Sequence, residues 1–178
     1  TQGCASSNQE SQPFYVNAPY GIMLAHNGNL TNAEALKQDL YEHDHRHINT
    51  TSDSEVLLNV LANEISRVCE GRGLDADGIF KAVAAVHKRV RGSYAVVALI
   101  AGKGLLAFRD PHAIRPICFG SAIAANGERE WMVSSESVTM MGLGFKLERD
   151  LEPGEALWID FKGNVETRQC AENPVKNP

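Results

Sequence analysis

The sequence predicts an α+β domain in which helices lie outside a pair of packed β-sheets. Apolar residues recur at helical spacing in three consecutive segments between residues 32 and 90. A nearly continuous apolar run follows at 93–101, which is typical of a strand buried on both faces. Short strand-like segments separated by turn residues then extend along the rest of the chain. Helices grouped before many antiparallel strands favour a layered arrangement of helices on sheets.

Each element has its own local signal in the first half of the chain. Two apolar segments are expected to be strands, at 13–16 and 22–26, and the second is expected to end in a tight turn at Asn27-Gly28. Three segments with apolar residues at helical spacing are expected to be helices: 32–41, 52–65 and 77–90. Two helix starts match the spacing of a capping box, Thr31 with Glu34 and Ser52 with Glu55.

The second half of the chain predicts mainly antiparallel strands. The expected strands, after the apolar run, are 105–108, 114–120, 130–134, 145–149, 155–160 and 165–168. A short helix is expected to start at 135–138. Residues 171–178 are polar and proline-rich, which is typical of a linker, so the domain is expected to occupy residues 1–170.

Composition limits the classes of function. The 178 residues are 43% hydrophobic with a formal net charge of −5, so we expect one domain with a substantial core. Basic residues are not interleaved with aromatics, which argues against nucleic acid as a partner. No run approaches the ~18 apolar residues of a membrane-spanning helix, and no signal peptide opens the chain. The four cysteines form no Cys-x-x-Cys pair, so we expect no metal site and a cytoplasmic location.

Two places in the first half of the chain hold candidate catalytic or substrate-binding residues. The Asn27 side-chain amide can donate a hydrogen bond, and Gly28 lacks a Cβ, so its backbone N–H can approach a ligand closely. Two converging donors can stabilise the oxyanion of an acyl-transfer reaction, although an ordinary turn explains the same dipeptide. Asp53, in the first turn of the second helix, can receive an ammonium group, although the helix dipole alone also accounts for a carboxylate there.

Eight segments, taken in order, match one known family: 12–17, 26–32, 47–55, 89–95, 108–111, 114–116, 134–137 and 153–156. Together they resemble the class II glutamine amidotransferase domain of the amidophosphoribosyltransferase family, over nearly the whole chain. The resemblance implies an N-terminal nucleophile hydrolase fold, a four-layer αββα sandwich, here lacking its N-terminal segment. It also implies hydrolysis of L-glutamine, with ammonia passed to a phosphoribosyltransferase half. That half makes 5-phosphoribosylamine from phosphoribosyl pyrophosphate in de novo purine biosynthesis.

The resemblance implies roles for individual residues. Asn27 and the backbone N–H of Gly28 match the family's oxyanion hole, and Asp53 matches the acid that binds the α-amino group of glutamine. Thr1 matches the threonine of an Arg-Tyr-x-Thr segment that supports the substrate carboxylate. The family's nucleophile is a cysteine at the mature N-terminus in a Cys-Gly-x-x-Gly context, which has no match here. We therefore expect the 178-residue polypeptide alone to be inactive.

The resemblance also bears on partners and leaves alternatives open. It implies no cofactor in this chain, Mg²⁺ in the phosphoribosyltransferase half and a homo-oligomer, and it leaves open an iron–sulfur cluster. His112-Ala113 stands where the family usually has Asn-Gly. One alternative is the glutaminase half of glucosamine-6-phosphate synthase or asparagine synthetase. Others are a hydrolase with Thr1 as its own nucleophile and a non-catalytic glutamine-binding or structural piece.

Overall fold

The computed structural model describes residues 11–70 and 73–175. One sheet contains β1 (Phe14–Val16), β2 (Ile22–Leu30), β3 (Gly92–Ile100), β4 (Gly104–Arg109), β8 (Glu155–Asp160) and β9 (Val165–Gln169), hydrogen-bonded in that order. A smaller sheet has the order β6 (Arg129–Ser134), β5 (Cys118–Ile123), β7 (Lys146–Asp150). The helices are α1 (Ala33–Glu42), α2 (Asp53–Val68), α3 (Ala76–Arg89) and α4 (Ser137–Gly142). None of these helices has the length and hydropathy needed to cross a bilayer.

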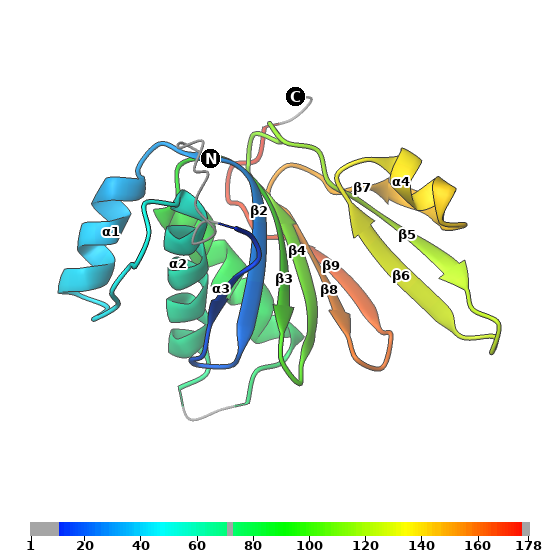
Figure 1. Cartoon of the computed structure of the whole chain (residues 1–178), viewed down its shortest axis with the longest axis horizontal. Helices are drawn as coiled ribbons and strands as arrows, with labels where there is room; N and C mark the ends of the chain where they lie inside the picture. Colours follow the sequence, from blue (N-terminus) through cyan, green and yellow to red (C-terminus); the bar gives the residue numbers. More distant parts are fainter. Residues whose placement is uncertain (1–10, 71–72, 176–178) are drawn as a thin grey trace.

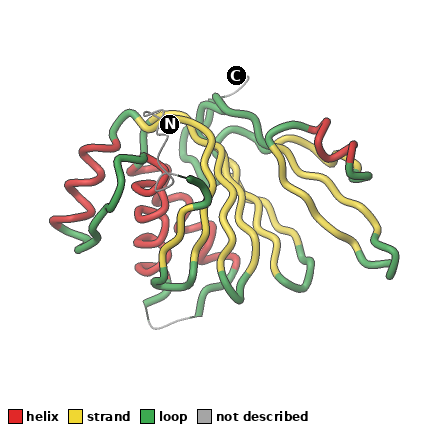
Figure 2. Tube along the Cα trace, viewed as in Figure 1, coloured by secondary structure: helices red, strands yellow, loops and turns green. Residues whose placement is uncertain are grey.

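The elements form four layers (Figures 1 and 2). Helices α1 to α3 lie on one side of the large sheet, the small sheet lies on the other side, and α4 lies beyond the small sheet. Neighbouring residues of β5 show why α4 forms an outer layer. Phe119 packs toward the large sheet, whereas Gly120 faces Met140 of α4. This αββα order confirms the predicted fold class.

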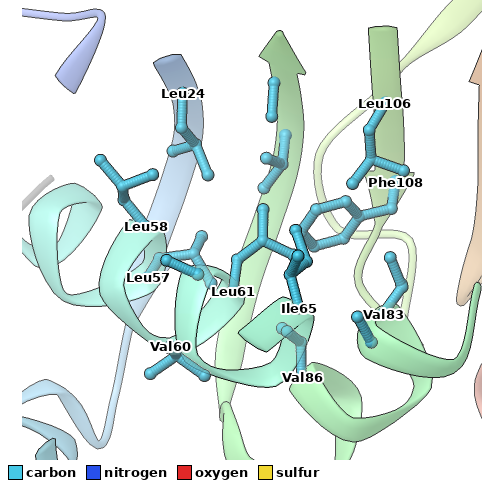
Figure 3. Close-up of a cluster of buried hydrophobic side chains, with 14 of the residues drawn as sticks. Leu24, Leu57, Leu58, Val60, Leu61, Ile65, Val83, Val86, Leu106 and Phe108 are labelled. Atoms are coloured by element: carbon cyan, nitrogen blue, oxygen red, sulfur yellow. The ribbon is translucent and has the colours of Figure 1, made fainter. Parts of the chain in front are cut away.

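The larger core lies between the helices and the large sheet, where α2 and α3 pack against β2, β3 and β4 (Figure 3). Alternation along β3 turns four almost completely buried side chains toward the helices: Tyr94, Val96, Ala98 and Ile100. On α2, four buried residues at helical spacing meet them: Leu57, Leu58, Leu61 and Ile65. Burial of this apolar face holds α2, and with it Asp53, against the end of β2.

A second core lies between the two sheets. Ala95 of β3 and Ala107 of β4 face Phe119 of the small sheet, with Leu151 and Leu157 beside them. The strand predicted to be buried on both faces is therefore covered on both sides, although less completely on this one. Its residues Val97 and Leu99 are only half-buried.

The predicted turn at Asn27-Gly28 is wrong, because β2 continues through this dipeptide to Leu30. It stays paired with β3 as far as the Leu30–Gly92 pair. Gly28 has φ +150°, and a Cβ built on it would lie 2.0 Å from the carbonyl oxygen of Ser93. The glycine is thus required by the close approach of β3 and not by a reversal of the chain.

The predicted cap of α1 is also wrong. The helix begins after Asn32, one residue later than Thr31, and no side chain caps it. The Asn32 amide instead donates to the Arg89 carbonyl at 2.9 Å and accepts from the backbone N–H of Arg91 at 2.9 Å. These bonds tie the start of α1 to the connection between α3 and β3.

The strand predicted at 114–120 begins later, at Cys118, because Asp110 folds the preceding residues into a loop. This fully buried carboxylate accepts backbone N–H groups from His112 at 2.9 Å and from Ile114 at 3.2 Å. Between them, Ala113 has φ +51°, the left-handed conformation that a glycine adopts more easily. The turn keeps this conformation although alanine stands where the resemblance places glycine.

Candidate functional site

The described candidate residues lie where β2 ends beside the start of α2. Side chains alternate along β2, so Asn27 is exposed on the face opposite α2, while its neighbours His26 and Gly28 are buried. Asp53 is the first residue of α2 and is 5% exposed. Thr1 lies outside the described residues.

Asp53 has one carboxylate oxygen satisfied and one unsatisfied. Its Oδ2 accepts the backbone N–H of Leu30 at 2.9 Å, which joins the start of α2 to the end of β2. Its buried Oδ1 meets no hydrogen-bond donor among the described residues. A buried carboxylate oxygen without a donor is costly, so the site favours a ligand that brings a cation or a donor.

A cleft of approximately 330 Å³ opens at Asp53. It is lined by residues 29–35, Thr51 and Asp53, which come from the end of β2, the start of α1 and the loop before α2. The described lining does not include Asn27 or Gly28, which lie one to two residues earlier on β2. The structure therefore places Asp53 in a cleft and the two predicted oxyanion donors on the strand that leads into it.

The loop before α2 is held by Glu55. Its carboxylate accepts the backbone N–H groups of Asn49 at 2.9 Å and Thr50 at 2.7 Å, and also their side chains. Burial alone would raise the pKa of Glu55, but these hydrogen bonds outweigh it and hold the pKa below its ordinary value. Of the predicted capping box, Ser52 does accept the N–H of Ser54 at 3.3 Å. Glu55 binds the loop instead of completing the box.

A buried histidine lies beneath this site, and sequence reasoning did not single it out. His26 is 5% exposed, with Nδ1 3.1 Å from Ser54 Oγ and 3.9 Å from Asp53 Oδ1. Burial lowers the pKa of His26, although the charge of Asp53 opposes the shift, so the imidazole is neutral at neutral pH. The sequence carries no clear signal for this, because Ile22 to Ala25 is a continuous apolar run and only the alternating burial of β2 in the structure shows that His26 points inward.

The described cysteines lack the features of a nucleophile. Cys118 is 2% exposed and burial raises its pKa, while burial raises the pKa of Cys170 to about 11. Burial also raises the pKa of Cys69. The reactive form of cysteine is the thiolate, which these surroundings disfavour. Among the described residues, no group of three or more histidine, cysteine or acidic side chains is placed to hold a metal ion.

Comparison with known families assigns the chain to one of them. Residues 3–141 match the family described as "Glutamine amidotransferase domain". The chain belongs to this family. The match agrees with the resemblance that the eight sequence segments carry.

Curated relatives and solved structures agree with this assignment. The chain is 55% identical over 174 residues to the amidophosphoribosyltransferase of Escherichia coli (strain K12), covering 98% of this chain and 34% of that protein. It is 48% identical to the amidophosphoribosyltransferase of Saccharomyces cerevisiae, covering 93% of this chain and 33% of that protein. Glutamine phosphoribosylpyrophosphate amidotransferase from B. subtilis, solved with ADP and GMP, superimposes with a TM-score of 0.73 at 30% identity. That alignment covers 96% of this chain and 34% of the other, so the chain spans about a third of these relatives.

Proposed function

We propose that this domain is the glutaminase portion of an amidophosphoribosyltransferase. It hydrolyses L-glutamine and supplies ammonia to a phosphoribosyltransferase half for the synthesis of 5-phosphoribosylamine. A homo-oligomer and Mg²⁺ in the phosphoribosyltransferase half belong to the same proposal. Support comes from the family match, the named relatives and the chemistry of the cleft at Asp53.

The unpartnered Oδ1 of Asp53 is the observation that carries the proposal. Asp53 lines a small cleft, and while one of its carboxylate oxygens accepts the Leu30 N–H, the other still lacks a donor. The α-ammonium group of an amino acid brings both a positive charge and hydrogen-bond donors. Binding it at Oδ1 would offset the cost of burying that oxygen.

The chemistry divides between this chain and an N-terminal cysteine. The free α-amine of that cysteine, with an unperturbed pKa of ~8, accepts the thiol proton, and the thiolate attacks the side-chain amide carbon of glutamine. Asn27 and the Gly28 N–H stabilise the oxyanion that forms. The C–N bond then breaks, the amine's proton passes to the leaving ammonia, and water hydrolyses the thioester to glutamate.

Substitution of Asp53 tests the proposal in the full-length form, meaning this chain joined to the N-terminal cysteine segment and the phosphoribosyltransferase half. Asp53→Asn keeps an acceptor for Leu30 N–H but removes the negative charge. The KM for glutamine should rise by ~10- to 100-fold, because a charge-assisted hydrogen bond contributes ~1.5–3 kcal/mol. Ammonia-dependent synthesis should be unchanged, since ammonia bypasses this site.

A matched control is Asp75→Asn. Asp75 caps α3, where its Oδ1 accepts the Gly78 N–H at 2.8 Å, and it does not line the cleft. This variant makes the same chemical change at another helix start and should leave both activities unchanged. Equal loss of glutamine- and ammonia-dependent activity in Asp53→Asn would mean that Asp53 is only a structural contact for Leu30, and would refute the proposal.

A further inference from the structure

A chain of hydrogen bonds connects the strand that carries Asn27 with the helix that carries Asp53. Its members are Gln12, His26 and Ser54, which we call the Gln12 cluster. The Gln12 side chain accepts the backbone N–H of His26 at 2.5 Å, donates to the His26 carbonyl at 2.9 Å and donates to Ser54 Oγ at 3.3 Å. Ser54 is fully buried and the His26 side chain is 0% exposed.

The Gln12 side chain replaces the backbone of a paired strand residue opposite His26. The β1–β2 register pairs Phe14 with Leu24. Equivalent pairs in an antiparallel ladder recur every two residues, so extending this register by two residues would pair Gln12 with His26. β1 starts at Phe14, and Pro13 has no backbone N–H to continue the ladder. The Gln12 carboxamide supplies one acceptor and one donor to the backbone of His26. Those are the two bonds that a paired strand residue would make, and they hold the residue before Asn27 in place.

The contacts of His26 assign its tautomer. A neutral imidazole has one N–H and one acceptor nitrogen. Nε2 lies 3.4 Å from the carbonyl oxygen of Ser93, which can only accept, so Nε2 carries the proton. Nδ1 then accepts the hydroxyl proton of Ser54 at 3.1 Å, while Ser54 Oγ accepts from Gln12. In this tautomer Nδ1 offers no proton to Asp53 Oδ1, 3.9 Å away.

We propose that His26 is a positioning residue for glutamine hydrolysis, acting through the Gln12 cluster. It links the strand of the oxyanion donors to the start of α2. By holding its proton on Nε2 it leaves Asp53 Oδ1 without a donor, so that the α-ammonium group of glutamine can supply one. The inference rests on the proposed function, because it assigns Asp53 as the ammonium receiver.

Removing the Ser54 hydroxyl tests this link. In the full-length form, Ser54→Ala removes the hydroxyl that donates to Nδ1. The neutral imidazole can then carry its proton on Nδ1 instead of Nε2 and donate it to Asp53 Oδ1. The KM for glutamine should rise ~10-fold, the effect of about one hydrogen bond to a charged group, with a smaller change in kcat. Ammonia-dependent synthesis should be unchanged. Ser54→Thr retains the hydroxyl and should restore most of the affinity.

Ser121→Ala is the matched control. Ser121 is also a buried serine, 7% exposed, and its hydroxyl donates to Glu148 at 2.7 Å in the small sheet, away from β2 and α2. Its removal should change neither activity. An unchanged KM in Ser54→Ala, with KM still raised in Asp53→Asn, would overturn the role of His26 and leave the proposed function standing. An unchanged KM in Asp53→Asn would overturn the proposed function itself.

The tautomer can be measured without any substitution. Nitrogen-15 shifts of the His26 ring in the full-length form at neutral pH report which nitrogen is protonated. We expect a protonated Nε2 and an unprotonated Nδ1. A proton on Nδ1 would overturn the inference whatever the stability of the Ser54 variants.

Discussion

Replacing Gly28 with alanine tests the reason for a glycine in the middle of β2. A Cβ at this position would lie 2.0 Å from the Ser93 carbonyl oxygen and 2.8 Å from His26 Nε2. Restoring an ordinary separation of ~3.5 Å would move β2 and β3 apart by ~1.5 Å. Residue 28 would also have to keep φ +150°, which L side chains rarely adopt.

The magnitude follows from these two effects. A residue held in such a conformation costs ~1–3 kcal/mol, and the loss of two hydrogen bonds between β2 and β3 costs ~1 kcal/mol each. Gly28→Ala should therefore lower the free energy of unfolding by ~3–5 kcal/mol and the melting temperature by ~6–20 °C. Urea denaturation and thermal circular dichroism measure these quantities.

Gly142→Ala provides the control. Gly142 ends α4, has no atom within 4 Å of an added Cβ, and its φ is not positive. Because alanine is favoured over glycine in helices, this variant should be as stable as the parent or slightly more so. A melting temperature for Gly28→Ala within ~2 °C of the parent would refute the close-approach argument, and the glycine would then need another explanation.

Three further predictions concern other parts of the chain. Because the folded pKa of Glu55 is lowered, its carboxylate stabilises the fold above the unfolded pKa of ~4.3, and this contribution is lost as pH falls through the folded pKa. Glu55→Gln should thus be less stable than the parent at neutral pH, with the gap closing in acid denaturation, whereas exposed Glu130→Gln should show no gap. Ala113→Gly should raise stability by ~0.5–1 kcal/mol by relieving φ +51°; a loss of stability in denaturant titration would contradict this. The 178-residue polypeptide should release no ammonia from glutamine, since none of its four cysteines is N-terminal, and turnover that cysteine alkylation abolishes would contradict that expectation.

Local patterns in the sequence were sufficient for much of the fold. The helical spacing of apolar residues located α2 and placed Asp53 in its first turn, because a helix start depends on neighbours within one turn. The strand at 155–160 was predicted with its exact bounds for the same reason, since its apolar run from Ala156 to Ile159 and its flanking turns are local. The order of the short motifs also pointed to the amidotransferase family before any contact was known.

Tertiary structure decided which of these residues meet. Asn27-Gly28 looks like a turn in isolation, and only pairing with β3 extends β2 through it, since Ser93 lies 65 residues further along the chain than Gly28. The same holds for Asp53, whose contact with Leu30 N–H and whose unpartnered Oδ1 depend on how α2 packs against β2. Periodicity in the sequence states which face of an element is buried. It does not state the register between distant elements, and that register sets the hydrogen bonds of the candidate site and leaves one carboxylate oxygen of Asp53 without a partner.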